Sequence, residues 1–215
     1  MNSVDIALCL AMDVSASVSF EEFGLMAGGT AAAFRDASVL AAATGGPRRA
    51  AAVALLLWSG PGQQDLAIGW TRIADPAGAE ALAQAIESAP RLPRPGATAL
   101  GEGMAAGLAT LARCPAEATR YVMDVSGDGR HNQGRDPAPV RDLAVAAGIT
   151  INGLAILNEE PDLLGHYSAE VIGGPGAFLM VAEGFDAFET AVKRKIIREI
   201  ASAPAPGPLV ERAFA

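Results

Sequence analysis

The chain has 215 residues, of which 51% are hydrophobic, 19% are charged and 5% are aromatic. A domain of this length can bury a large core without disulfide bonds or structural metal ions. Its two cysteines, Cys9 and Cys114, make no disulfide framework. The formal net charge of −8 argues against a nonspecific nucleic-acid binder, which needs a basic surface, and against binding to an anionic membrane surface.

Two features bear on where the chain resides. It contains no run of 18 apolar residues, so we expect no transmembrane helix and no membrane insertion. The first residues lack the basic start of a secretory signal. This is compatible with a cytosolic protein, or with a periplasmic or secreted one whose signal is absent from this sequence, and the sequence does not decide between them.

Apolar runs alternate with helical patterns along the chain. We predict six strands, at residues 4–12, 50–58, 65–73, 120–125, 150–157 and 177–181. Helices are predicted at residues 20–42, 76–89, 99–113, 137–148, 164–171 and 185–201. A capping box of Ser19 and Glu22 marks the start of the first helix. In the last helix, residues 193–198 are expected to form a solvated, basic face.

The alternation of strands and helices predicts one α/β domain. The short link after residue 58 favours an antiparallel hairpin, which makes residues 65–73 an edge strand. We therefore expect a doubly wound, mostly parallel six-stranded sheet with one antiparallel edge strand and helices on both faces, of Rossmann-like type. This domain covers residues 1–202, and the proline-rich tail, residues 203–215, is not expected to be a core element.

Oxygen-bearing side chains occur where this architecture would place a ligand. In open α/β sheets, ligands bind beyond the carboxyl ends of the strands. Three segments reach that edge: the loop after the first strand carries Asp13, Ser15 and Ser17, Thr98 precedes a helix, and Asp128 follows a later strand. Hydroxyls and carboxylates suit a hard divalent cation, with Mg²⁺ favoured and Ca²⁺ or Mn²⁺ as alternatives.

Each of these residues has a simpler interpretation when taken alone. Ser15 and Ser17 are typical of a turn or cap before a helix, Thr98 of an N-cap, and the Asp128–Gly129 pair of a turn. Their joint order along the chain favours a metal site. Nearby, Asp124 is expected to be a paired structural residue, and His131 a solvated loop residue.

Taken together, these residues resemble the metal-ion-dependent adhesion site (MIDAS) of the von Willebrand factor A (VWA) domain. That pattern is Asp-x-Ser-x-Ser, a distant Thr and a more distant Asp followed by Gly, although Gly127 stands here where a Thr is common. The resemblance covers residues 4–200 and is closest to a little-characterised bacterial branch of the family. The segments that carry this closer likeness are 13–15, 126–129, 150–156 and 173–176.

The resemblance implies a role for each residue. The hydroxyls of Ser15 and Ser17 would bind the metal directly, and Thr98 directly or through water. Asp13 and Asp128 would contact the ion mostly through water while orienting the hydroxyls. An ion with few direct carboxylate ligands stays electrophilic and keeps one coordination position open, which an Asp or Glu carboxylate of a protein partner can fill.

The expected function is therefore divalent-cation-dependent protein binding without catalytic turnover. The alternative is a Mg²⁺-dependent phosphatase-like hydrolase that uses Asp13 as the nucleophile and Asp128 as a metal ligand. Such enzymes usually place a second Asp two residues after the nucleophile as the general acid, and this chain has Ser15 there. A degenerate domain with an empty site is a further alternative, against which the complete ligand set argues. The sequence does not name the partner.

Overall fold

The computed structural model describes residues 3–91, 96–158, 160, 162–201 and 209–213. One sheet runs through the domain, with the strand order β3-β2-β1-β4-β5-β6-β7. The strands are β1 (Val4–Asp13), β2 (Ala51–Trp58), β3 (Gln64–Ile73), β4 (Ala118–Gly127), β5 (Ile149–Ile156), β6 (Phe178–Ala182) and β7 (Leu209–Ala213). Only the β2–β3 pair is antiparallel, which confirms the predicted edge hairpin.

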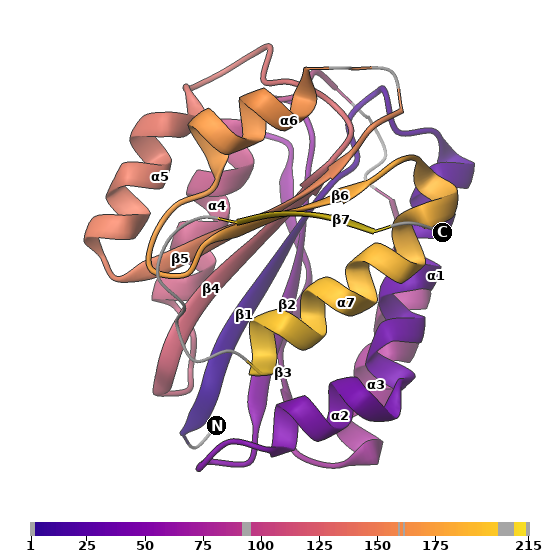
Figure 1. Ribbon diagram of the computed structural model, residues 1–215, viewed down its shortest axis with the longest axis vertical. Helices are drawn as coiled ribbons and strands as arrows, with labels where there is room; N and C mark the ends of the chain where they lie inside the picture. The colour runs from indigo at the N-terminus through magenta and orange to yellow at the C-terminus, as the bar shows by residue number, and fades with distance from the viewer. Residues whose placement is uncertain (1–2, 92–95, 159, 161, 202–208, 214–215) are drawn as a thin grey trace.

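Helices cover both faces of this sheet, as predicted (Figure 1). They are α1 (Phe20–Arg35), α2 (Ala37–Thr44), α3 (Pro76–Glu87), α4 (Leu100–Ala112), α5 (Pro137–Ala146), α6 (Leu163–His166) and α7 (Phe188–Ala201). A π-helical turn (Tyr167–Val171) continues α6, and a 3₁₀ turn (Phe185–Ala187) precedes α7. The doubly wound α/β class is therefore confirmed. Among the described residues, no helix is long and apolar enough to cross a membrane.

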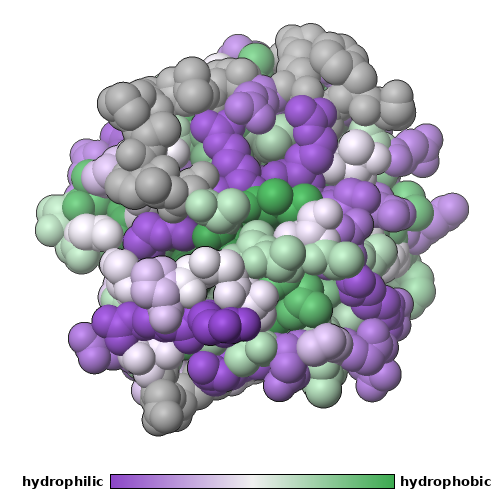
Figure 2. All heavy atoms as spheres, turned by 60° about the horizontal axis from the view of Figure 1, so that its bottom comes forward, coloured by the Kyte–Doolittle hydropathy of each residue, from purple (hydrophilic) through white to green (hydrophobic). Residues whose placement is uncertain are grey.

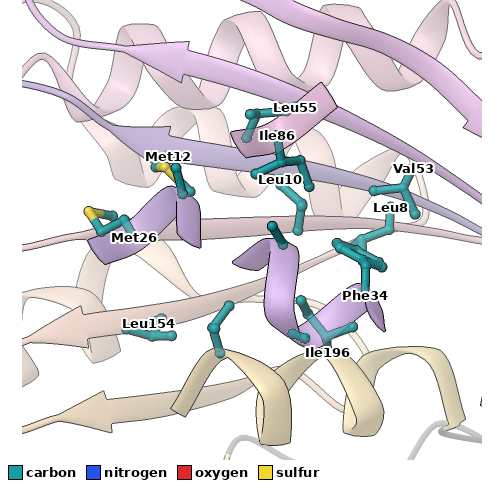
Figure 3. Close-up of a cluster of buried hydrophobic side chains, with 14 of the residues drawn as sticks. Leu8, Leu10, Met12, Met26, Phe34, Val53, Leu55, Ile86, Leu154 and Ile196 are labelled. Carbon is teal, nitrogen blue, oxygen red and sulfur yellow. The ribbon is translucent and has the colours of Figure 1, made fainter. Parts of the chain in front are cut away.

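Most of the core lies in two apolar layers, one on each side of the sheet, and a small third cluster contains Val4, Ala50, Ala52 and Ala116. The first lies between the sheet and α1, α2, α3 and α7, and Figure 3 shows part of it, including Leu8 and Leu10 of β1, Phe34 of α1 and Ile196 of α7. The second lies under α4, α5 and the π-helical turn. Strand β1 is therefore buried on both faces, as its nearly continuous apolar run predicted.

The structure corrects two of the predicted boundaries. The helix expected at residues 20–42 is broken at Asp36, whose extended backbone ends α1 and whose side chain caps α2 by accepting from the Ser38 N–H. The tail contributes a strand that was not predicted, because β7 pairs in parallel with β6. The remainder of the predicted tail, residues 203–208 and 214–215, lies outside the described residues.

One residue of the predicted solvated face is buried. Lys195 has no exposed surface, and its Nζ lies 2.5 Å from Asp124 Oδ1 and 2.8 Å from Glu199 Oε1. Asn152 also donates to Glu199, and Ser126 donates to Asp124. The prediction for Lys195 was wrong because its partner Asp124 comes from β4, far away in the sequence, whereas the prediction that Asp124 is paired is confirmed.

The face brought forward in Figure 2 mixes hydrophilic residues with a smaller apolar area. The large hydrophobic side chains that are exposed on the described part of the chain are Phe20, Leu25, Leu66 and Leu143. Cys9 and Cys114 are both free thiols.

Replacing Lys195 should destabilise the fold strongly. Lys195→Met leaves the Asp124 and Glu199 carboxylates buried without their cation, and we expect a loss of about 3–5 kcal/mol in the free energy of unfolding. Urea denaturation monitored by circular dichroism measures it. Lys193→Met is the matched control, because that side chain is 41% exposed and pairs only with Asp36, so its loss should stay below about 1 kcal/mol. Equal small losses in both variants would contradict the proposed role of the buried lysine.

The same cluster should make stability depend on pH. The pKa of Glu199 is raised from 4.5 to about 7, mainly by burial and also by the Asp124 charge, against the opposing effects of Lys195 and the Asn152 hydrogen bond. Between these two values the folded protein holds a proton that the unfolded chain has released, so this group lowers stability as the pH rises.

We therefore expect the stability of the wild type relative to Glu199→Gln to fall as the pH rises from 4.5 to 7, by on the order of 3 kcal/mol. Urea denaturation of both proteins across this interval checks the difference. Two parallel stability curves would contradict the shifted pKa.

Candidate metal centre

The first candidate segment is a tight turn at the end of β1. The Val14 N–H donates to the Trp58 carbonyl at 2.8 Å, which extends the pairing of β1 and β2 by one residue. The Ser15 N–H then donates to Asp13 Oδ1 at 2.7 Å, a local bond that Asp favours in turns. Asp13 and Ser15 are both fully buried. Their orientation is therefore fixed by the strand and by each other.

The structure brings the five predicted residues together at one edge of the sheet. Ser15 Oγ lies 3.1 Å from Ser17 Oγ, and Thr98 Oγ1 lies 3.4 Å from Ser15 Oγ. Ser17 in turn donates to Asp128 Oδ1 at 2.8 Å. Neighbouring oxygens around an octahedral Mg²⁺ ion, with its short metal–oxygen bonds, lie about 3 Å apart. The spacing of these hydroxyls fits such an ion.

Backbone hydrogen bonds hold the three loops to one another. The Ala16 N–H donates to the Gly96 carbonyl at 2.9 Å. Asn132 clamps Thr98 from both sides: its Oδ1 accepts from the Thr98 N–H at 2.9 Å, and its own N–H donates to the Thr98 carbonyl at 3.1 Å. Asn132 therefore fixes the backbone of a candidate ligand without being a ligand.

Arg91 holds the first loop from the other side. Its guanidinium donates to the carbonyls of Val14, Ser15 and Val18, the contact with Ser15 measuring 3.1 Å. The Ser15 carbonyl also accepts from the Val18 N–H at 3.1 Å, and the arginine adds a donor to each of the three carbonyls. Neither Arg91 nor Asn132 was predicted from the sequence.

The buried carboxylate of Asp13 is incompletely compensated. Its pKa is raised from 3.8 to about 7, mainly by burial and also by the Asp128 charge, against the opposing effects of the hydrogen bonds from Ser15 and the Arg91 charge. Asp13 Oδ2 is buried without a hydrogen-bond partner in the described structure, and so is the Tyr167 hydroxyl. A Cβ placed on Gly127 would lie 2.8 Å from each of these two oxygens. A buried carboxylate oxygen that lacks a hydrogen-bond partner would be compensated by a cation or by a water molecule bound to it.

Glycine also leaves room beside the hydroxyls. A Cβ on Gly129 would lie 3.2 Å from Thr98 Oγ1 and 3.7 Å from Ser17 Oγ, so the absence of a side chain keeps this space open. Within the described residues, no three His, Cys, Asp or Glu side chains cluster as a metal site. A cation here depends on hydroxyl ligands, and a donor set made only of oxygen favours Mg²⁺ over softer metals.

The geometry does not favour the phosphatase alternative. Asp13 is fully buried and its Oδ1 is engaged by the Ser15 N–H, so it is not presented as a nucleophile. Ser15 cannot act as the general acid that the reaction needs. His131 is only partly solvated: its side chain is 13% exposed, because the loop folds back so that its N–H donates to His166 Nε2. Asp124 lies on the other face of the sheet with Lys195 and does not join the site.

A family model matches residues 3–204 of the chain, and its description is "Protein of unknown function (DUF1194)". The chain belongs to this family. A search of curated proteins finds no match.

Similar solved structures show that this DUF1194 chain has the VWA fold. A von Willebrand factor type A protein from Catenulispora acidiphila is 16% identical with a TM-score of 0.64 over 92% of this chain and 43% of its own. Proximal thread matrix protein 1 from the mussel byssus, with a zinc-occupied MIDAS motif, is 16% identical with a TM-score of 0.68 over 95% of this chain and 48% of its own. This chain therefore spans less than half of either structure.

A third similar structure is a domain of a pilus protein. The vWF domain of the type V pili tip protein Mfa5 from Porphyromonas gingivalis is 10% identical, with a TM-score of 0.64 over 94% of this chain and 98% of its own. The predicted VWA resemblance is confirmed at the level of the fold. Identities this low do not test the ligand set.

Removing Arg91 should loosen the first loop while the sheet persists. Arg91→Ala removes the donors to three carbonyls, and we expect faster amide exchange at residues 14–18 and a loss of about 1–3 kcal/mol in the free energy of unfolding. Hydrogen exchange followed by mass spectrometry measures the exchange rate of the amides in this loop. Arg113→Ala, at an exposed position, is the control. Equal exchange in both variants would contradict the role of Arg91.

Proposed function

We propose that this chain is a protein-binding domain that depends on a divalent cation and has no catalytic turnover. The proposed ion is Mg²⁺, with Mn²⁺ or Ca²⁺ as substitutes. The residues that surround it in the proposal are Asp13, Ser15, Ser17, Thr98 and Asp128.

The observation that carries the proposal is the chain of hydroxyls that ends on a carboxylate. Three side-chain hydroxyls from two loops lie within 3.4 Å of a neighbour, and Ser17 links them to Asp128. These groups are donors as well as acceptors, and the chain also holds a buried carboxylate oxygen, Asp13 Oδ2, two residues before Ser15, that has no hydrogen-bond partner among the described residues. Around a divalent cation, the lone pairs of these oxygens would all point toward the same positive charge.

The proposed division of labour follows from charge. The neutral hydroxyls of Ser15 and Ser17 bind the ion directly and leave most of its positive charge uncompensated. Asp128 accepts from the Ser17 hydroxyl and orients it, and Asp13 accepts from the Ser15 backbone N–H and fixes the turn that carries that serine. The ion thus attracts a carboxylate from outside this ligand set, and an Asp or Glu side chain of a protein partner has that chemistry.

The VWA fold and its neighbours support an interaction role. The Mfa5 domain belongs to a pilus tip, and the byssus protein has a zinc-occupied MIDAS motif. Zinc in proteins prefers nitrogen and sulfur ligands, whereas the residues gathered here offer only oxygen. Mg²⁺ is therefore the ion that we propose for this chain.

Removing Asp13 tests the proposal directly. Asp13→Asn keeps the shape of the side chain and removes its charge, so we expect Mn²⁺ and Mg²⁺ affinity to fall at least tenfold in isothermal titration calorimetry while the far-ultraviolet spectrum is unchanged. Asp65→Asn, on the exposed edge of β3, is the matched control. Because Asp13 is fully buried, Ser17→Ala at an exposed position gives a second test in which folding is not at risk. Wild-type affinity in both site variants would refute the proposed metal site.

A further inference from the structure

A small pocket joins the candidate ligands to a side chain from another loop. Its volume is about 120 Å³, and it is lined by Ser17, Thr98, Asp128, Gly129, Arg130, Asn132 and Glu160. At about 30 Å³ for each liquid water molecule, it has room for roughly four waters, or for a cation and one carboxylate. Glu160 belongs to the loop between β5 and α6 and was not predicted to be part of any site.

The loop that carries Glu160 is tied to the loop that carries Ser17. The Asn158 side chain donates to Glu22 Oε1 at 3.3 Å, and Glu22 Oε2 accepts from the Ser19 N–H at 2.7 Å within the capping box of α1. One glutamate therefore bridges the two loops. The Glu160 carbonyl in turn accepts from the Leu163 N–H at 3.2 Å, which anchors the loop to the start of α6.

The charges around the pocket leave the Glu160 carboxylate without a cationic partner among the described residues. Arg130, which lines the same pocket, pairs with Asp162 at 2.7 Å. Glu160 is exposed and lines the same cavity of about 120 Å³ as Ser17, Thr98 and Asp128. Its carboxylate therefore lies where it can approach an ion that those side chains bind.

We infer that Glu160 is a metal ligand supplied by the chain itself. Its carboxylate fills the coordination position that the hydroxyls leave open, and the carboxylate of a protein partner must displace it. This inference rests on the proposed function, because it requires a cation among Ser15, Ser17 and Thr98. Glu160 would therefore compete with the partner's carboxylate for the same coordination position on the ion.

The test uses Mn²⁺ alone as the probe. Glu160→Gln removes an anionic ligand and lets water take its place on the ion. We expect Mn²⁺ affinity by calorimetry to fall roughly tenfold. We also expect the water-proton relaxivity of the protein-bound Mn²⁺ to rise by the contribution of one additional bound water. A merely structural role for Glu160 would not raise the relaxivity.

Glu117→Gln is the matched control, since it makes the same chemical change at an exposed glutamate that does not line the pocket. Its relaxivity should equal that of the wild type. If the wild type binds Mn²⁺ and Glu160→Gln has unchanged affinity and relaxivity, the inference about Glu160 is overturned and the metal site stands. If the wild type binds no Mn²⁺, both proposals fail.

Discussion

The parallel pairing of β1 on both of its edges is the constraint on which the candidate site depends. β1 pairs with β2 on one side and with β4 on the other, so the carboxyl ends of three strands meet at one edge of the sheet. Asp13 ends β1, Asp128 follows β4, and Ser59 follows β2. Ser59 accepts from the Gly96 N–H through its Oγ and from the Ala99 N–H through its carbonyl, which brings Thr98 to the same edge.

Two groups of buried acids on opposite faces of this sheet are compensated differently. Asp124 and Glu199 enclose Lys195, so this cluster carries its own cation. Asp13 is fully buried, and its Oδ2 has no hydrogen-bond partner among the described residues, while the guanidinium of Arg91 donates to backbone carbonyls. Burying a charge without a partner is costly. The first cluster therefore contains a cation of its own, although Asp124 Oδ2 and Glu199 Oε2 lack hydrogen-bond partners in the described structure. A cation at the second group would have to come from solution.

Much of the fold follows from local sequence. The apolar run that ends at Asp13 predicts a buried central strand, and the short link before β3 predicts the antiparallel edge. The five oxygen-bearing residues were found because each stands at a strand end or before a helix, where the order of elements alone places it. The short strand β7 was missed because five residues after a proline-rich segment carry little periodic signal.

The supporting contacts could not be predicted in the same way. Arg91, Asn132 and Glu160 act on residues that are distant in the sequence, and each stands in a loop with no periodic pattern. Lysine is a residue type typical of exposed helix positions, yet a carboxylate from β4 compensates the charge of Lys195 in the core. A sequence pattern indicates which face of a helix is apolar, but it does not show which distant side chain compensates a charge on that face.

A ligand within the chain changes what binding a partner requires. A partner carboxylate gains only the difference between its own bond to the ion and the bond of Glu160 that it replaces. The apparent association constant is therefore the intrinsic constant multiplied by the fraction of molecules in which Glu160 is already displaced. Because that loop is joined through Asn158 and Glu22 to the capping box of α1, its displacement and the position of the Ser17 loop are energetically linked. Weak carboxylates from solvent would then be excluded, and a partner would need further contacts around the pocket to gain entry.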